Sequence, residues 1–403
     1  MYLRCHDREC GATLDLHDRA LECPKCGGLL EVAVEEVPLA SDELKALWRE
    51  RRMSRDPRDI SGVWRYREFL PTYEPQQIVT LGEGNTPLVR GKRTAEWAGV
   101  HDLQFKHLGW NPTACFKDLG MTTGMTEAFR AGARVVACAS TGNTAASMAA
   151  YAARAGVVGR VYLPAGQVSL NKLAQAIDYG AEIVEIEGSF DDALNTLLAT
   201  AGGEVYFLNS INPFRVEGQK TTMFDLLDQL YWQSPDYLIV PGGNLGNSAA
   251  FGKAFEELLR FGLIERAPRM VVVQAAGANP FARLWQSGAK ELVPVAEPET
   301  DATAIRIGNP RSWKKSLRGV QLTGGCVLDV TEDEIAEAKA VIGRDGIGCE
   351  PASAVTLAGL RKLRRAGTVA ENASVVAILT GHVLKDTNFI IKHAEKEEHA
   401  HVG

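Results

Sequence analysis

Hydrophobic and polar residues follow two rhythms along most of this chain. Beyond residue 82, short hydrophobic runs rich in β-branched residues predict buried strands at 135–139, 160–163, 181–186, 205–209, 237–240, 270–274 and 375–380. Stretches with hydrophobic residues three and four positions apart predict helices, among them 119–130, 144–155, 170–178, 190–201 and 248–261. Alternating strands and helices form parallel sheets with helices on both faces, so the pattern predicts an α/β fold.

The part before residue 82 has a different pattern. The charged segment VEEVPLASDELKALWRERRMSRDPRD predicts a linker with a helix over 41–53, capped by Ser41 and with Glu43 in its first turn. At 403 residues the chain is expected to form two or more domains. We predict a small module at 1–36, a large domain built from 37–125 and 209–403, and a small α/β domain at 126–208.

Four of the eight cysteines crowd the first thirty residues: Cys5, Cys10, Cys23 and Cys26. In a reducing compartment such a cluster indicates a metal site before it indicates disulfides. Four thiolates suit tetrahedral Zn²⁺, and His6 is an alternative ligand. The competing interpretation is a small ribbon that has lost its metal. In either case the module is structural, because a closed four-ligand site has no open position for catalysis.

Charge and hydropathy exclude several classes of protein. The formal net charge of -6 argues against a nucleic-acid-binding surface. No hydrophobic run reaches the ~18 residues that a membrane helix requires, so no membrane partner is expected. The amino terminus is too charged for a secretory signal. These observations predict a cytoplasmic protein.

Lys117 is the first candidate for chemistry. It lies in the stretch NPTACFKDLGM at 111–121, just before a predicted helix. A helix start disfavours a cation, because the helix dipole there favours negative charge. A lysine at such a position indicates a desolvated amine that is kept for chemistry, whereas the ordinary alternative is a solvated side chain.

Three loops of small residues follow predicted strands, where open α/β sheets bind ligands. Residues 140–144 open a helix and suit a carboxylate, residues 242–247 let the backbone approach a phosphate, and Thr380 presents a hydroxyl at a strand end. Each loop alone is weak evidence, because such turns are common. Together with a lysine amine, they are the parts that pyridoxal 5′-phosphate chemistry needs.

Several motifs then carry a resemblance. NPTACFKDLGM, ASTGNTAASMAAYAARAG, GGNLGN and TGHVLKD, in this order, resemble fold-type II pyridoxal-phosphate enzymes and most closely the threonine synthase family. LGEGNTPL, NSINPFRVEGQKT, AIRIGNPRSWKKSLRG and GIGCEPASA extend the match over nearly all of the chain after residue 81. The cysteine ribbon resembles those of many bacterial members. The resemblance implies a fold like that of the tryptophan synthase β subunit, with two open, twisted, mostly parallel sheets flanked by helices.

The same resemblance implies a role for each matching residue. Lys117 would carry the coenzyme, with Phe116 beside its ring and Asn143 at its 3′-oxygen, and Thr380 would pair with its pyridine nitrogen. The coenzyme phosphate would be held by Gly242, Gly243, Asn244, Leu245, Gly246 and Asn247. The substrate carboxylate would be received by Ser140, Thr141 and Thr144, and the substrate phosphate by Asn209, Ser210 and Arg215.

The implied reaction is the conversion of O-phosphohomoserine and water to threonine and phosphate by a homodimer. Alternatives on the same scaffold are a cysteate synthase, which uses O-phosphoserine and sulfite, and a threonine or serine dehydratase. A non-catalytic binder of amino-acid phosphates would not need Lys117.

Some positions depart from the family or stay open. Where the family reads Gly-Ser-Phe-Lys-Asp-Arg, this chain has Ala114, Cys115 and Leu119 around the shared Phe-Lys-Asp. Lys220 is a second candidate for the leaving phosphate or a surface lysine at a helix start. We expect Asp118 to cap the following helix, and Glu350 either to reach the coenzyme pocket or to cap a helix.

Overall fold

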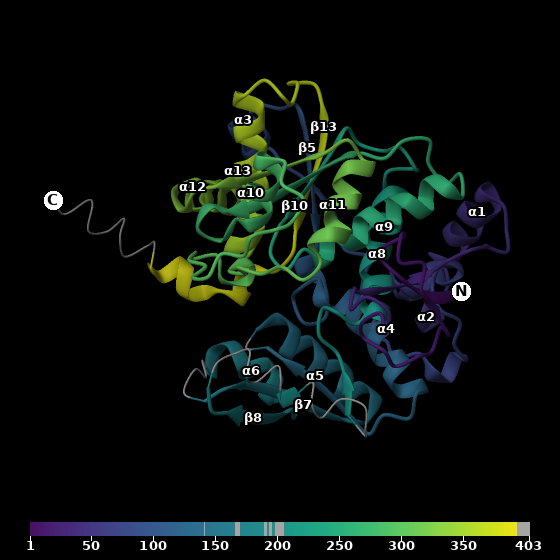
Figure 1. The fold of residues 1–403 in the computed structure, drawn as a ribbon. Coiled ribbons are helices and arrows are strands. Elements are labelled where there is room, and N and C mark those ends of the chain that lie inside the picture. Colours follow the sequence, from purple (N-terminus) through teal and green to yellow (C-terminus); the bar gives the residue numbers. More distant parts are fainter. Residues whose placement is uncertain (141, 166–169, 189–191, 193–195, 198–204, 393–403) are drawn as a thin grey trace. The chain divides into compact units, whose positions relative to one another are not determined.

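The computed structural model describes residues 1–140, 142–165, 170–188, 192, 196–197 and 205–392 (Figure 1). The chain folds into two compact units, each made of three segments. Unit 1 contains Met1–Asn85, Asn111–Asp228 and Glu257–Glu265. Unit 2 contains Thr86–Trp110, Gln229–Glu256 and Arg266–Gly403. The large domain predicted from the sequence contains residues of both units.

Unit 1 has two sheets. The cysteine ribbon is a three-stranded antiparallel sheet in the order β2-β1-β3, and the second sheet has four parallel strands in the order β8-β7-β6-β9. The strand bounds are β1 Tyr2–Cys5, β2 Thr13–Leu14, β3 Leu30–Ala33, β6 Val135–Ala139, β7 Val158–Pro164, β8 Glu182–Ile186 and β9 Val205–Phe207. The predicted strands in this region are confirmed, although β9 ends two residues before the predicted end at 209.

The helices of unit 1 follow the predicted alternation. They are α1 Ser41–Arg51, α2 Pro57–Ile60, α4 Lys117–Arg130, α5 Asn143–Ala155, α6 Leu170–Asp178 and α8 Pro213–Gln229, whose last residue belongs to unit 2. The helix predicted at 190–201 lies largely outside the described residues. One core gathers side chains of α4, α5 and the strands between them, including Met121, Met125, Val136 and Met148. Strand β6 is buried along its whole length, as its continuous hydrophobic run predicts.

The N-cap of helix α1 lies one residue before the predicted position. Ala40 is the N-cap residue and Ser41 is the first helical residue, so the predicted capping by Ser41 is wrong. Glu43 still supplies part of the cap, because its carboxylate accepts a hydrogen bond of 3.0 Å from the backbone N–H of Ala40. On the buried face, Trp48 packs edge-on against Tyr66 and Phe224. The helix is therefore held more by aromatic packing than by its cap.

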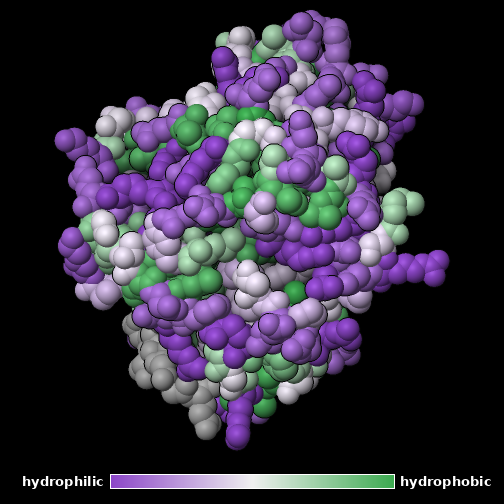
Figure 2. All heavy atoms as spheres, turned by 90° about the vertical axis from the view of Figure 1, so that its right-hand side faces the viewer, coloured by the Kyte–Doolittle hydropathy of each residue, from purple (hydrophilic) through white to green (hydrophobic). Residues whose placement is uncertain are grey.

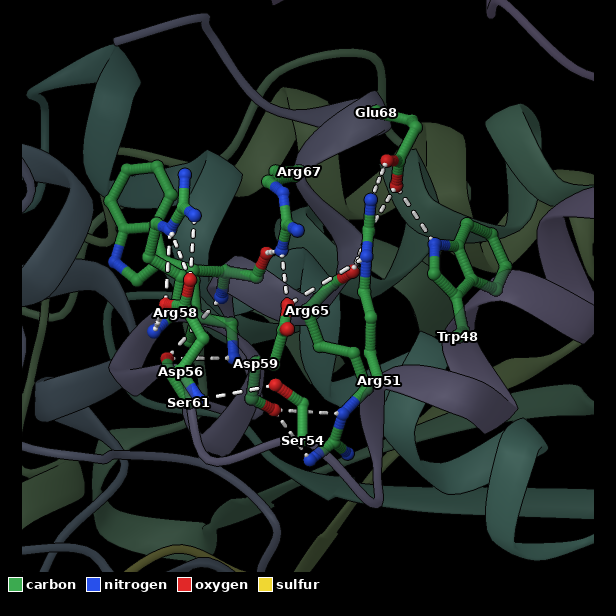
Figure 3. Close-up of polar contacts among 12 residues, drawn as sticks. Trp48, Arg51, Ser54, Asp56, Arg58, Asp59, Ser61, Arg65, Arg67 and Glu68 are labelled. Carbon is green, nitrogen blue, oxygen red and sulfur yellow. Dashed lines mark hydrogen bonds and ion pairs between the residues drawn. The ribbon is translucent and has the colours of Figure 1, made fainter. Parts of the chain in front are cut away.

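Charged side chains tie residues 48–68 together (Figure 3). Arg51 donates to both oxygens of Glu68, at 2.9 and 2.5 Å, and Arg67 donates to Asp59 at 2.6 Å. Arg65 is buried and donates to the Asp59 carbonyl and to Asn85 Oδ1. This network holds the segment against the end of the LGEGN stretch.

Unit 2 is built on one six-stranded sheet in the order β12-β11-β10-β13-β5-β4. All neighbouring pairs are parallel except β4 with β5 at one edge. The strands are β4 Leu88–Arg90, β5 Asp102–His107, β10 Tyr237–Pro241, β11 Arg269–Ala275, β12 Cys326–Val330 and β13 Ser374–Leu379. The predicted fold class of two mostly parallel sheets with helices is confirmed.

The helices of unit 2 complete its core. They are α3 Arg93–Ala98, α9 Gly246–Arg260, α10 Pro280–Ser287, α11 Trp313–Leu322, α12 Glu332–Arg344 and α13 Pro351–Arg365, and α9 ends within unit 1. Buried aliphatic side chains from the strands and from α12 and α13 form a single cluster that includes Val273, Ile335, Leu357 and Ala377.

Exposed side chains on the face shown in Figure 2 are mostly hydrophilic, with hydrophobic residues in separate patches. The most exposed large hydrophobic residues, Met53, Tyr231, Val293 and Leu384, come from different segments. Within the described ranges, every helix is too short or too polar to cross a bilayer.

Candidate active site

Lys117 is the first residue of α4, as the sequence predicts. Its side chain is half-buried, and Nζ lies 4.0 Å from the centre of the Phe116 ring. The ring face carries partial negative charge and offsets part of the cost of placing an amine at a helix start. The two residues predicted to hold and flank the coenzyme ring are thus neighbours in space as well as in sequence.

The departures from the family pattern lie in the turn before Lys117 and in the first turn of α4. Ala114 has a φ of 63°, a left-handed conformation that glycine adopts without cost, so alanine here stores strain. Cys115 is buried, with Sγ 3.6 Å from Thr113 Oγ1 and 3.9 Å from the Asn143 carbonyl oxygen. Leu119 is buried as well, in a position that suits an aliphatic side chain.

Asp118 closes this turn instead of capping α4. Its carboxylate accepts hydrogen bonds from Thr113 N at 2.7 Å, Thr113 Oγ1 at 2.6 Å and Ser147 Oγ at 2.6 Å. Because Ser147 belongs to α5, Asp118 links the lysine turn to the helix that begins at Asn143. Burial is the largest influence on this group and raises the pKa of Asp118 to about 6.

The loop before α5 is the predicted carboxylate cradle. Ser140 Oγ accepts a hydrogen bond of 3.2 Å from Gly142 N, and Asn143 and Thr144 are half-buried in the first turn of α5. Thr141 lies outside the described residues. The first turn of a helix leaves backbone N–H groups available to an anion.

The predicted substrate-phosphate residues lie beside that loop, in the same unit. Asn209 bridges to β6, because its amide accepts from Ala139 N at 2.9 Å and donates to Ala139 O at 3.0 Å. Ser210 follows it and is half-buried. Arg215 is buried in α8, and its Nη1 donates to the Leu208 carbonyl oxygen at 3.1 Å. Unit 1 therefore brings the carboxylate loop, Asn209 and Arg215 together.

Arg215 is an unusual buried cation. Its Nε has no hydrogen-bond partner, and among the described residues no carboxylate forms an ion pair with it. Burial lowers the pKa of its guanidinium to about 10. A buried charge without a counterion is costly, and an anion bound here would remove most of that cost.

The interpretation of Lys220 as a surface lysine is wrong, whereas its role at the leaving phosphate stays a prediction. It lies inside α8, its side chain is completely buried, and Nζ forms ion pairs with Glu217 at 2.6 Å and Glu257 at 2.7 Å. The sequence did not reveal this buried position, because the partner Glu257 is too distant in sequence for local patterns to show it.

The glycine loop belongs to unit 2 and joins β10 to α9. Gly242 N donates to the Val273 carbonyl at 2.7 Å, and Gln274 Nε2 donates to the Gly242 carbonyl at 3.1 Å. Asn244 Oδ1 accepts from Arg311 N at 2.8 Å. The loop is fixed to the neighbouring strand through its backbone.

The second half of the loop has unused hydrogen-bonding groups. Leu245 has a φ of 62°, and Gly246 opens α9. Asn247 is buried, and neither atom of its side-chain amide has a partner among the described residues. The unpaired Nδ2 of Asn247, in the first turn of α9, fits a bound phosphate, which would accept its hydrogen bond. The residues present therefore fit a phosphorylated coenzyme.

Thr380 and Glu350 form a second feature of unit 2. Thr380 Oγ1 donates to Glu350 Oε1 at 2.9 Å and lies 3.0 Å from Ser353 Oγ. Glu350 occupies the N-cap position of α13 but makes no capping bond with its side chain. Of the two alternatives for Glu350, the structure shows no helix cap made by its side chain. Its carboxylate instead accepts a hydrogen bond from Thr380, a partner that the sequence did not reveal.

The four clustered cysteines do converge. Their sulfur atoms all lie within 4.8 Å of one another, with 3.5 Å between Cys5 and Cys26 and 3.7 Å between Cys10 and Cys23. The cluster contains these four residues without His6.

Known proteins match this chain over most of its length. The sequence model of the family described as pyridoxal-phosphate dependent enzyme matches residues 79–381. The threonine synthase of Methanocaldococcus jannaschii is 46% identical over 390 residues, which cover 96% of this chain and 94% of the relative. The threonine synthase of Methanosarcina acetivorans is 43% identical over 397 residues, with 98% and 95% covered.

Solved structures share the fold. Threonine deaminase isoform 2 from Solanum lycopersicum has a TM-score of 0.66 at 18% identity, over 91% of this chain and 93% of that one. Maize serine racemase has a TM-score of 0.65 at 19% identity, with 79% and 94% covered. At this identity the likeness concerns the fold alone.

The chain therefore belongs to the family of pyridoxal-phosphate dependent enzymes and, within it, to the threonine synthases. It is a lyase whose cofactor is pyridoxal phosphate.

Proposed function

We propose that the enzyme converts O-phosphohomoserine and water to threonine and phosphate. The observation that supports this best is Arg215, a buried guanidinium whose Nε lacks a partner and which forms no ion pair with any carboxylate of the described chain. A dehydratase that expels only hydroxide has no need for such a group. A guanidinium binds phosphate oxygens in a fork and stabilises the charge that grows on a leaving phosphate.

The coenzyme, when bound, supplies an electron sink for charge that develops on the substrate carbon. In our proposal its phosphate would be held by Gly242, Gly243, Asn244, Leu245, Gly246 and Asn247. Lys117 would anchor it covalently, with Phe116 beside its ring, Asn143 at its 3′-oxygen and Thr380 at its ring nitrogen. Because Thr380 already donates its proton to Glu350, its oxygen is left to accept a hydrogen bond.

The remaining residues act on the substrate. The helix start with Ser140, Thr141 and Thr144 binds its carboxylate, and Lys117 Nζ takes the proton from the α-carbon. A second proton leaves the β-carbon, and Asn209, Ser210 and Arg215 hold the phosphate as it leaves the γ-carbon with the bonding electrons. The γ-carbon gains a proton, the hydroxyl of water adds to the β-carbon, and a proton returns to the α-carbon, which gives threonine and phosphate. Asn209 uses much of its amide on Ala139, so Arg215 is expected to provide most of the charge stabilisation.

Phosphate release tests this function. Purified enzyme should release phosphate from O-phosphohomoserine and form threonine, and it should be much slower with O-phosphoserine. Faster turnover of O-phosphoserine with sulfite would indicate a cysteate synthase, and ammonia release from threonine or serine would indicate a dehydratase. Binding without turnover of any of them would indicate a non-catalytic protein.

We also propose that Cys5, Cys10, Cys23 and Cys26 bind one Zn²⁺. Zinc–sulfur bonds of about 2.3 Å in a tetrahedron place the sulfurs about 3.8 Å apart, close to the spacing observed here. Elemental analysis should find one zinc per chain in the wild type and a loss of zinc in Cys23→Ser. Absence of zinc together with unchanged stability in chelator would refute the site.

We further propose a homodimer, as the resemblance implies, and a cytoplasmic location, as the charged amino terminus and short hydrophobic runs predict. The proposed domain bounds are 1–36, 37–125 with 209–403, and 126–208. Sedimentation should give twice the chain mass, and limited proteolysis should cut at these bounds. A monomer would refute the assembly.

A further inference from the structure

Among the residues that the structure describes, the hydrophobic core of the cysteine ribbon contains one side chain from another part of the chain. Leu3, Cys5, Cys23, Leu30 and Val32 form this core together with Phe214, which is 2% exposed. Phe214 belongs to the first turn of α8. The ribbon thus buries a residue that immediately precedes the buried cation Arg215.

Phe214 is also held by its backbone. Its N–H donates to Asn212 Oδ1 at 3.0 Å, and its carbonyl accepts from Thr123 Oγ1 of α4 at 2.8 Å. The two helices cross closely, since a Cβ added at Gly218 would lie 1.8 Å from the Leu119 carbonyl oxygen. The first turn of α8 therefore has little freedom to move, because the Phe214 side chain is packed in the ribbon core and its backbone is hydrogen-bonded to Asn212 and to Thr123 of α4.

The ribbon has further attachments to the helix that begins at Lys117. His17 Nδ1 lies 3.1 Å from Glu127 Oε2 near the end of α4, and Arg19 Nη2 donates to the Ala131 carbonyl at 2.9 Å. Leu21 packs against the cluster that includes Phe207, beside the loop that leads to Asn209. The ribbon therefore braces the end of α4, the start of α8 and the strand that leads to Asn209.

We propose that the ribbon positions the substrate-phosphate residues and that Phe214 is the positioning residue through which it acts. The proposal rests on the function proposed above. A displacement of about 1 Å at a binding group lowers activity by as much as 10²-fold, so a small shift of Arg215 is enough to weaken phosphate binding. The coenzyme phosphate is assigned to unit 2, so its binding does not depend on this turn.

Inorganic phosphate is the ligand for the test, measured by calorimetry on the holoenzyme. Phe214→Leu should raise the phosphate Kd roughly tenfold. The matched control is Phe224→Leu, a buried residue of the same helix that packs on Trp48 and not on the ribbon. It should change the Kd by less than about twofold while losing similar volume. Both variants should keep the coenzyme absorption band, and Phe214→Met replaces Phe214→Leu if the latter does not fold.

A double-mutant cycle separates positioning from general destabilisation. Leu30→Ala in the ribbon core should weaken phosphate binding as Phe214→Leu does, and the two changes together should be less than additive. Additive effects, or a Phe214→Leu variant that behaves like Phe224→Leu, would overturn the proposal. Arg215→Ala separates the assignment of the substrate phosphate from the positioning role of the ribbon. If Arg215→Ala binds phosphate as the wild type does, the assignment of the phosphate to Arg215 is wrong. If Arg215→Ala weakens phosphate binding but Phe214→Leu does not, only the positioning role is wrong.

Discussion

Two sets of candidate residues satisfy their polar groups differently: Asp118 and Asn209 in unit 1, and the glycine loop in unit 2. In unit 1, side chains bind other parts of the protein: Asp118 accepts three hydrogen bonds and Asn209 makes two. In unit 2, the glycine loop is held by its backbone, and the buried amide of Asn247 has no partner in the described chain. Asp118 and Asn209 are thus held in place by the protein itself, whereas the Asn247 amide is left to bind a ligand.

This difference predicts different consequences of substitution. Changes to side chains of unit 1 should alter chemistry or substrate choice while the coenzyme phosphate stays held. Substitutions that shift the backbone of the glycine loop should lower the affinity for the coenzyme before they alter the chemistry. A substitution in one unit that produced the effect expected of the other would show that the two units do not divide the work in this way.

The largest effect is expected for Lys117→Ala. Without the amine the α-proton has no base and the coenzyme has no covalent anchor, so kcat should fall by more than about 10³-fold. Borohydride followed by peptide mapping should fix the coenzyme to Lys117 in the wild type and to no lysine in the variant. Equal labelling elsewhere in both proteins would contradict the assignment.

Arg215→Ala should come next. The variant should lose about 2–4 kcal/mol in kcat/KM for O-phosphohomoserine, comparable to deletion of one oxyanion donor. Steady-state kinetics are measured beside the coenzyme spectrum, and Arg154→Ala at the exposed end of α5 is the control. Full activity, or loss of the coenzyme band, would show that Arg215 serves a different phosphate.

Gly242→Ala tests the glycine loop of unit 2. A Cβ there would lie 2.8 Å from Val272 Cγ1 and 2.9 Å from Gln274 Cγ, so the loop must shift. Coenzyme affinity should fall by about 1–3 kcal/mol, as measured by spectral titration of the apoenzyme. Gly343→Ala is the matched control, because the space around Gly343 in α12 is open and alanine favours a helix. Unchanged affinity in Gly242→Ala would argue against a tight loop.

The smallest effect concerns Asp118 and pH. Burial raises the pKa of Asp118 to about 6 from 3.8, so the folded protein binds this proton more tightly than the unfolded chain. The stabilisation is complete below the unfolded pKa and is lost as pH rises through about 6. The wild type should therefore gain about 1 kcal/mol over Asp118→Asn when the pH falls from 7 to 5. The free energy of unfolding is measured against pH for both proteins, and the same pH dependence in both would exclude such a shift in the pKa of Asp118.

Local patterns predicted what neighbours in sequence determine. Strands such as 135–139, the glycine loop and the place of Lys117 at a helix start follow from hydrophobic period and turn chemistry. The partners of Asp118, Lys220 and Thr380 did not follow, because Ser147, Glu257 and Glu350 are distant in sequence. In the sequence Phe214 resembles any other core residue, since the ribbon residues that surround it lie far away along the chain.

The interleaved segments of the two units also matter for synthesis. Unit 1 needs Glu257–Glu265, and its ribbon needs Phe214, so the first residues made wait for residues near the middle of the chain. At about 5–20 residues per second, the ribosome leaves the ribbon core open for many seconds. Until Phe214 is made, Leu3, Leu30 and Val32 lack one of the side chains that complete their core, so the ribbon reaches its final packing only after about half of the chain has been synthesised.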